Sequence, residues 1–265
     1  MSRAVMTIHG FLTKTTDFGR LYDYLDFYDE VVAVELPGHN CEPPDFSLFN
    51  VEDTFKAVLD VYDSLRAKHD TVDAVGFSMG GALAAWLAAE RDVGRAALVS
   101  PANKFINVAF PFSVGKFVNE TWIDTFCKTK GGLGKRFSAS HKVFTPYVQN
   151  MKSAMKIAKE RTFKYMSRKT FSVFSKVVKQ CNAEIEKSAP IDTPIFIMWG
   201  KLDELVPQRS LKYLTKHFPL AQVKIYPDVG HAVLSTNRDD ELIADIVEFL
   251  TDGARKVTVP KRQET

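Results

Sequence analysis

The stretch that most constrains the fold of this chain is a short apolar run that ends in a serine between glycines. Residues 71–77 are mostly β-branched or small and apolar, and after Ser78-Met79-Gly80-Gly81 a run of good helix formers extends to Glu90. Ser78 therefore sits where a predicted strand turns into a predicted helix. Residues 76–80 match the G-x-S-x-G pattern of a nucleophile elbow, in which a turn this sharp leaves no room for a Cβ on either side of the serine.

The pentapeptide alone leaves two interpretations of Ser78 open. Three fixed positions filled by common residues recur by chance in about one chain in ten of this length. A serine that follows a buried strand is also a common helix N-cap. A nucleophile needs a base, an acid and oxyanion donors as well, so the rest of the chain decides between the two interpretations.

Composition excludes several classes of protein. A chain of 265 residues with 45% hydrophobic and 25% charged residues can bury a sizeable core, and a net charge of +3 does not indicate a polyanionic partner. Cys41, Cys127 and Cys181 are far apart and lack a C-x-x-C spacing, which argues against a disulfide framework or a zinc site. The first apolar run is too short for a signal peptide and none could span a bilayer, so we expect a cytoplasmic protein.

Strands and helices alternate along most of the chain. We predict strands at residues 4–8, 31–34, 71–77, 96–99, 194–199 and 222–226, and helices at 18–28, 51–68, 82–90, 209–217 and 239–250. Such repeated units predict an α/β fold with a mainly parallel sheet, helices on both faces and ligands at the carboxyl ends of the strands. Residues 253–265 are expected to form a flexible tail.

A segment of different character, residues 102–189, interrupts this alternation. It holds 17 Lys and Arg against 5 Asp and Glu, a net charge of +12, together with 13 aromatic residues. We interpret it as a mostly helical, basic cap (lid) inserted into an α/β core of residues 1–101 and 190–252. Either its basic outer face is simply solvated, or its aromatic residues line an acyl pocket while its cations attract anionic lipid or acidic substrates.

The best candidate for a general base is His231. It follows the last predicted strand in Pro227-Asp228-Val229-Gly230-His231, and imidazole has an unperturbed pKa near neutrality. Four other histidines fit less well because they lie on predicted helices at the surface, in the insertion or ahead of the serine: His69, His217, His141 and His39.

The acid that orients this imidazole should lie at a neighbouring strand end. Asp203 comes shortly after the strand at 194–199, and we predict that it is the acid. A turn or N-cap carboxylate is the alternative interpretation, and Glu204 and Asp228 are weaker rivals. The chain order serine, aspartate, histidine is the one expected for an elbow of this type.

Two backbone amides complete the predicted site. His9-Gly10-Phe11 follows the first predicted strand, which in such a sheet lies beside the elbow strand. The N–H groups of Phe11 and Met79 can then converge on one oxygen as an oxyanion hole. We expect His9 to be a structural hydrogen-bonding residue rather than a second base.

Together these motifs resemble the α/β-hydrolase superfamily over essentially the whole chain. They stand in the family's order: His9-Gly10-Phe11, Leu36-Pro37-Gly38-His39, Gly76-Phe77-Ser78-Met79-Gly80-Gly81, Asp203 and Gly230-His231. Within that superfamily the sequence is most similar to small bacterial carboxylesterases and monoacylglycerol-lipase-like serine hydrolases, which carry a helical cap. One departure is that the family's first antiparallel strands have no counterpart ahead of the strand at 4–8, so we expect six parallel strands.

The resemblance implies a carboxylic ester hydrolase with Ser78 as nucleophile, His231 as base and Asp203 as the residue that orients it. It implies no metal and no organic cofactor, and it places substrate-binding residues within the cap at 102–189. Thioester, amide or C–C bond hydrolysis and perhydrolysis on the same triad are alternatives, and a non-catalytic binding module is another. We expect a small-molecule ester as the partner, no nucleic acid, and a peripheral contact of the basic cap with anionic lipid as an option.

Overall fold

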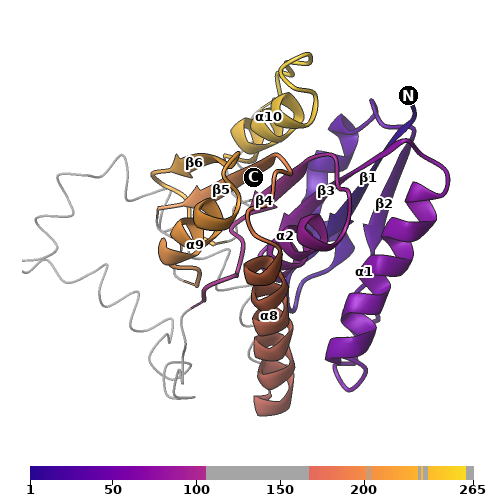
Figure 1. Cartoon of the computed structure of the whole chain (residues 1–265), viewed down its shortest axis with the longest axis vertical. Coiled ribbons are helices and arrows are strands. Elements are labelled where there is room, and N and C mark those ends of the chain that lie inside the picture. The colour runs from indigo at the N-terminus through magenta and orange to yellow at the C-terminus, as the bar shows by residue number, and fades with distance from the viewer. Residues whose placement is uncertain (106–166, 202, 204, 232–233, 235–237, 261–265) are drawn as a thin grey trace, which may run out of the picture.

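Six parallel strands form the centre of the molecule. They are β1 (Arg3–Ile8), β2 (Glu30–Val34), β3 (Thr71–Phe77), β4 (Ala96–Val99), β5 (Ile195–Gly200) and β6 (Gln222–Tyr226). Their order in the sheet is β2-β1-β3-β4-β5-β6 (Figure 1). The computed structural model describes residues 1–105, 167–201, 203, 205–231, 234 and 238–260. The predicted mainly parallel, six-stranded sheet is confirmed.

The burial of each strand follows from its place in the sheet. The side chains of β4 and β5 are buried throughout, whereas the edge strand β6 exposes residues such as Val223 and Ile225 and buries only its last residue, Tyr226. A parallel strand covered by helices on both faces is apolar along its whole length, which explains the continuous apolar runs in the sequence. β4 pairs directly with β5, so the strands on either side of the long segment 100–194 are neighbours in the sheet.

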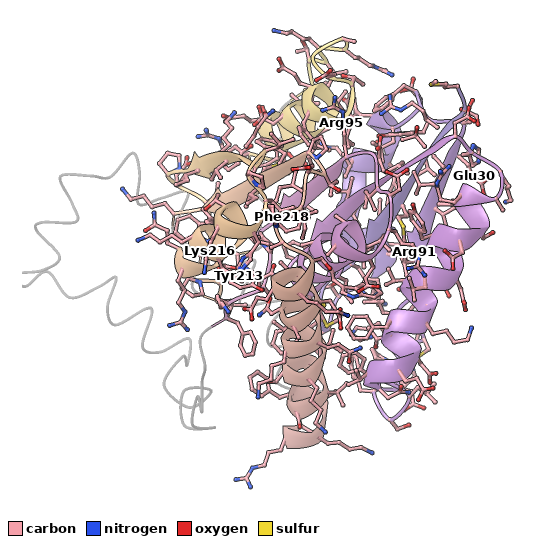
Figure 2. All side chains as sticks on the ribbon, in the orientation of Figure 1. Glu30, Arg91, Arg95, Tyr213, Lys216 and Phe218 are labelled. Carbon is pink, nitrogen blue, oxygen red and sulfur yellow. The ribbon has the colours of Figure 1, made fainter. Side chains whose placement is uncertain are left out.

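Helices cover the two faces of the sheet and enclose two apolar cores. On one face lie α1 (Val51–Arg66), α2 (Met79–Glu90), α8 (Arg168–Ser188) and α9 (Arg209–His217). On the other lie η1 (Thr15–Tyr24) and α10 (Asp239–Leu250). The Tyr213 hydroxyl on α9 donates to the carbonyl oxygen of Asn182 on α8 at 3.0 Å, and Figure 2 shows this side chain between the two helices.

One local expectation differs from the structure. The helix expected at 18–28 is a 3₁₀-helix, η1, and it is interrupted by Gly19 with φ 53° and ψ −128°. A glycine adopts this conformation readily, and it breaks the regular hydrogen-bond pattern of a helix. In the segment expected to be a flexible tail, Val259 is buried in the core beneath η1, and the Arg20 side chain donates to the Pro260 carbonyl oxygen at 2.6 Å.

Part of the segment predicted to be a cap packs on the sheet. The apolar face of α8 contributes Phe174, Val177, Cys181 and Ile185 to the core that α1 and α2 also cover. Its N-cap is Ser167, whose side chain accepts a hydrogen bond from the Thr170 N–H. The greater part of the predicted cap, residues 106–166, lies outside the described residues, and the cap boundaries therefore stay a prediction.

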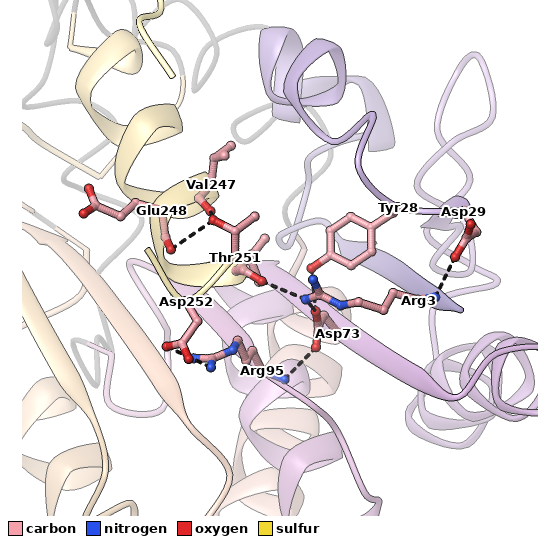
Figure 3. Close-up of polar contacts among 10 residues, drawn as sticks. Arg3, Tyr28, Asp29, Asp73, Arg95, Val247, Glu248, Thr251 and Asp252 are labelled. Carbon is pink, nitrogen blue, oxygen red and sulfur yellow. Dashed lines mark hydrogen bonds and ion pairs between the residues drawn. The ribbon is translucent and has the colours of Figure 1, made fainter. Parts of the chain in front are cut away.

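A buried carboxylate fastens the amino ends of the central strands. Asp73 on β3 is 1% exposed and accepts hydrogen bonds from Arg3 Nη2 at 2.7 Å, Tyr28 OH at 2.5 Å and Arg95 N at 2.7 Å (Figure 3). Burial, together with the negative charge of Asp73, raises the pKa of Tyr28, which therefore stays a neutral donor. The donors come from the start of β1, the loop before β2 and the start of β4, so one carboxylate joins three segments.

Replacing this carboxylate should destabilise the fold. Asp73→Ala removes the acceptor of the Tyr28 hydroxyl and the charged partner of the Arg3 guanidinium, and we expect a loss of about 3 kcal/mol in the free energy of unfolding, measured in urea. Asp252→Ala is the matched control, because its side chain is 81% exposed and pairs with Arg95 at 3.0 Å. The control should lose less than about 1 kcal/mol. Equal losses in the two variants would contradict this role of Asp73.

Candidate active site

The turn between β3 and α2 places Ser78 in a conformation that few residues adopt. Its backbone has φ 54° and ψ −113°, in the positive-φ region that favours glycine. A Cβ at Gly76 would lie 2.2 Å from the carbonyl oxygen of Gly80, and one at Gly80 would lie 1.9 Å from that of Ile8. The elbow therefore requires glycine at both positions, as the sequence indicated.

Backbone hydrogen bonds hold this strained turn in place. The Ser78 N–H donates to the Val99 carbonyl at 2.9 Å, and the Ser78 carbonyl accepts from the Ala102 N–H at 3.0 Å. Backbone strain at a single residue costs about 1–3 kcal/mol and persists only where the surroundings enforce it. Here β4 and the turn after it enforce it, and the serine projects beyond the carboxyl edge of the sheet.

Three side chains predicted from the sequence meet at that edge. His231 Nε2 lies 2.9 Å from Ser78 Oγ, and His231 Nδ1 lies 2.9 Å from Asp203 Oδ2 and 3.1 Å from Oδ1. The Asp203 carboxylate is fully buried, and His231 is 9% exposed. Because the Nδ1–H donates to a carboxylate, Nε2 is left with the lone pair that can accept the serine proton.

The acid is held by its own loop. Asp203 Oδ1 accepts hydrogen bonds from the Leu205 N–H at 2.9 Å and the Val206 N–H at 2.7 Å. Trp199 Nε1 donates to the Val206 carbonyl at 2.8 Å and ties this loop to the end of β5. These two backbone donors fix the direction in which the carboxylate faces His231.

The histidine loop folds back onto the same strand end. A Cβ at Gly200, the last residue of β5, would lie 2.2 Å from the Val229 carbonyl oxygen. The loop that carries His231 can therefore cross the end of β5 only because position 200 has no side chain. This contact could not be predicted from the sequence, since a glycine at the end of a strand is also common in ordinary turns.

The rival candidates take other roles or lie outside the described residues. Asp228 accepts a hydrogen bond from Arg238 Nη1 at 2.8 Å, and Glu204 is not among the described residues. His217 is 8% exposed and its Nδ1 lies 2.8 Å from the Tyr213 carbonyl, so the expectation of a surface position was wrong. The apolar face of α9 packs on the sheet and carries this ring with it.

The two predicted oxyanion donors lie on neighbouring segments. β1 pairs with β3 so that Ile8 is opposite Gly76, and a Cβ at Gly10 would lie 3.1 Å from Ser78 Cβ. The Phe11 amide thus follows directly after a residue that contacts the serine, and the Met79 amide begins α2. Neither N–H donates to an acceptor in the described part of the chain. A helix N-terminus beside such a pair favours negative charge.

An aromatic cluster adjoins the Phe11 side of the site. The Phe11 ring stacks on Phe174 of α8 with centroids 5.0 Å apart, and it lies 5.6 Å from Phe49. Phe105 lies 4.8 Å from Phe174 and 6.0 Å from Phe171. These five rings, which we call the aromatic cluster, include residues just before and just after 106–166. Sequence reasoning pointed to the aromatic residues of the insertion and missed Phe49.

A buried histidine sits behind this cluster. His39 is 1% exposed, its Nδ1 donates to the Pro37 carbonyl at 2.9 Å, and its ring centroid lies 4.9 Å from that of Phe49. Burial, with a smaller contribution from His9, lowers the pKa of His39 from 6.5 to about 3. His39 is therefore neutral at physiological pH.

This depressed pKa makes stability depend on pH. The unfolded chain protonates His39 near pH 6.5 and the folded protein only near 3, so the stabilisation is complete above 6.5 and is lost as the pH falls toward 3. We expect the free energy of unfolding of the wild type to fall more steeply between pH 6 and 4 than that of His39→Gln. The difference in slope should reach about 1 kcal/mol per pH unit. Parallel profiles from urea unfolding at pH 6, 5 and 4 would contradict this.

Comparison with known proteins identifies the family. A family model described as the alpha/beta hydrolase fold matches residues 3–237. The chain belongs to this family. A carboxylesterase of Bacillus subtilis (strain 168) is 21% identical over 255 residues, which cover 94% of this chain and 92% of that protein. A putative esterase/lipase 2 of Mycoplasma genitalium is 26% identical over 237 residues, or 85% of this chain and 81% of that protein.

A solved structure shows the same fold. The monoacylglycerol lipase of Paleococcus ferrophilus superposes with a TM-score of 0.63 at 17% identity, covering 95% of both chains. Among the described residues of this α/β hydrolase, no helix has the length and apolar character needed to cross a membrane. The same residues contain no group of three or more His, Cys, Asp or Glu arranged to hold a metal ion.

Proposed function

We propose that this α/β hydrolase is a serine hydrolase that cleaves carboxylic esters through an acyl-enzyme on Ser78. The observation that carries the proposal is the continuous hydrogen-bonded relay from Ser78 Oγ to His231 Nε2 at 2.9 Å and from His231 Nδ1 to Asp203 at 2.9 Å. A serine hydroxyl is a weak nucleophile by itself, and an adjacent oriented imidazole is what activates it.

The reaction follows from the positions of these groups. Ser78 Oγ attacks the ester carbonyl carbon while His231 Nε2 takes its proton, and the carbonyl oxygen becomes an oxyanion facing the Phe11 and Met79 N–H groups. His231 then returns the proton to the departing alkoxide, so that the alcohol leaves and an acyl-serine remains. Water, deprotonated by the same imidazole, attacks this ester, and the bond between the acyl carbon and Ser78 Oγ breaks. The imidazolium returns its proton to Oγ, which releases the carboxylic acid and restores the free serine.

Asp203 acts through the histidine. Its buried carboxylate accepts the Nδ1–H, which fixes the tautomer that leaves Nε2 free to act as a base, and it stabilises the imidazolium formed in each step. The two backbone N–H donors from Leu205 and Val206 hold the carboxylate against rotation. The acid therefore does not itself need to accept the proton.

The surroundings favour an ester with an apolar acyl group. The aromatic cluster offers ring surface at Phe11, whose N–H is proposed to face the oxyanion. Apolar surface of this kind binds hydrocarbon. Together with the carboxylesterase and lipase relatives, this supports short- to medium-chain acyl esters or monoacylglycerol-like lipids as substrates. We also propose that further substrate-binding residues lie in the basic cap, where a contact with anionic lipid would be made.

Removing the nucleophile tests the proposal directly. Ser78→Ala should lower kcat for p-nitrophenyl butyrate by about 10⁴ or more, because both chemical steps pass through this oxygen. A fluorophosphonate should label the wild type at Ser78, as read by peptide mass spectrometry, and should not label the variant. Ser47→Ala, at an exposed serine in the loop before α1, should keep both properties. Near-normal turnover by Ser78→Ala would exclude the proposed mechanism.

The aromatic cluster predicts a dependence on acyl length. Phe171→Leu removes half-buried ring surface without touching Phe11, and we expect kcat/KM to fall about fivefold for a p-nitrophenyl octanoate and less than twofold for the acetate. Phe27→Leu, at the apolar core on the other face of the sheet and away from the cluster, should leave both values unchanged. An equal loss for both esters would show that the cluster does not contact the acyl chain.

A further inference from the structure

One peptide group of the proposed site is held from its far side. The Phe11 N–H belongs to the same amide plane as the Gly10 carbonyl, because residues 10 and 11 share that peptide bond. A trans peptide is rigid and planar, so its N–H points opposite to its C=O. Whatever fixes the Gly10 carbonyl oxygen therefore also fixes the direction of the Phe11 N–H.

Three donors converge on that carbonyl oxygen. Thr13 Oγ1 donates to it at 2.8 Å, His9 Nδ1 lies 2.9 Å away, and the Thr13 N–H donates at 3.3 Å. The Leu36 N–H donates to the other nitrogen of His9, Nε2, at 3.3 Å. Since Nε2 of a neutral imidazole then serves as the acceptor, the proton is on Nδ1, which makes it a donor to Gly10.

The turn that these donors close is under strain. The Thr13 N–H and the Gly10 carbonyl close a four-residue turn, and Leu12 within it has φ 61°. A residue with a Cβ reaches this region only when its surroundings enforce it. The Thr13 hydroxyl supplies the shortest of the three bonds. By holding the Gly10 carbonyl oxygen, it opposes rotation of the Gly10–Phe11 peptide plane.

These bonds also strengthen the donor itself. Hydrogen bonds accepted by an amide oxygen polarise the amide, and chains of such bonds reinforce one another in a buried setting. His9 and Gly10 are both buried, so water does not compete there. The Phe11 N–H is thus both aimed and polarised before a substrate arrives.

We propose that Thr13 is a positioning residue for the oxyanion, acting through the Gly10 carbonyl on the Phe11 N–H. This inference rests on the proposed function. In this role Thr13 acts through the Gly10 carbonyl and not by a contact with the substrate. Its hydroxyl can be removed with little change of shape, whereas His9 also binds the Leu36 N–H and joins two loops.

The test compares Thr13→Val, which removes the hydroxyl, with Thr13→Ser, which keeps it. Loss of one oxyanion donor lowers kcat by about 10²–10³, and a donor that is present but misdirected should cost about tenfold. We expect Thr13→Val to lose about tenfold in kcat for p-nitrophenyl acetate and octanoate alike, with KM within about twofold of the wild type. Inhibition by a trifluoromethyl ketone, whose adduct carries the oxyanion, should weaken by the same factor.

Thr15→Val, two positions away at the first residue of η1, is the matched control. The Thr15 hydroxyl accepts from Asn40 Nδ2 at 3.0 Å and does not contact Gly10, so this variant should keep kcat within about twofold. Thr13→Ser should restore kcat and inhibitor affinity to nearly wild-type values. If Thr13→Val does not fold in thermal melts, Thr13→Ala takes its place in the comparison with Thr13→Ser.

Specific outcomes overturn the assignment. They are a kcat unchanged by loss of the hydroxyl, a loss in Thr13→Ser equal to that in Thr13→Val, or an equal loss in Thr15→Val. A wild type that hydrolyses none of the esters and is not labelled at Ser78 would instead overturn the proposed function. Wild-type hydrolysis with an unimpaired Thr13→Val would overturn the role of Thr13 alone.

Discussion

The close approach of backbone to backbone at the elbow is the constraint on which the site depends. The first turn of α2 lies so near the ends of β1 and β3 that a Cβ at Gly80 would lie 1.9 Å from the Ile8 carbonyl oxygen. This contact pushes Ser78 out beyond the sheet and sets the α2 N-terminus beside the serine. It also brings the loop after β1 against the serine, so nucleophile and predicted oxyanion donors share one steric origin.

Parallel pairing then gathers the remaining groups at the same edge. Asp203 and His231 follow adjacent strands, β5 and β6, and are 28 residues apart, whereas Ser78 and His231 are 153 residues apart. The carboxyl ends of parallel strands all lie at one edge, so residues after successive strands meet without any local sequence relation. Two strands, β4 and β5, lie between β6 and the serine strand β3, and the His231 loop reaches back over them by crossing the end of β5 at Gly200.

Stabilising polar contacts and strained backbone lie at opposite ends of the strands. At the amino ends, the buried Asp73 carboxylate joins three segments through a partly buried ion pair with Arg3 and two further hydrogen bonds (Figure 3). At the carboxyl ends, Ser78 and Leu12 hold positive φ angles that cost free energy. The contacts of Asp73 are separate from those that hold Ser78 and Leu12. The free energy gained at the amino ends can therefore offset the backbone strain at the carboxyl ends.

The sequence by itself determined the strand order along the chain, the two elbow glycines and the positions of Asp203 and His231, because each depends on a short window of apolar periodicity or turn chemistry. It also favoured a helix at 18–28, where Gly19 alters the local backbone. Only the tertiary structure decided that Asp228 pairs with Arg238, that His217 is buried, and that Phe11 stacks on Phe174. Those contacts join segments that are far apart in the chain, and a local sequence pattern does not identify a partner at such a distance.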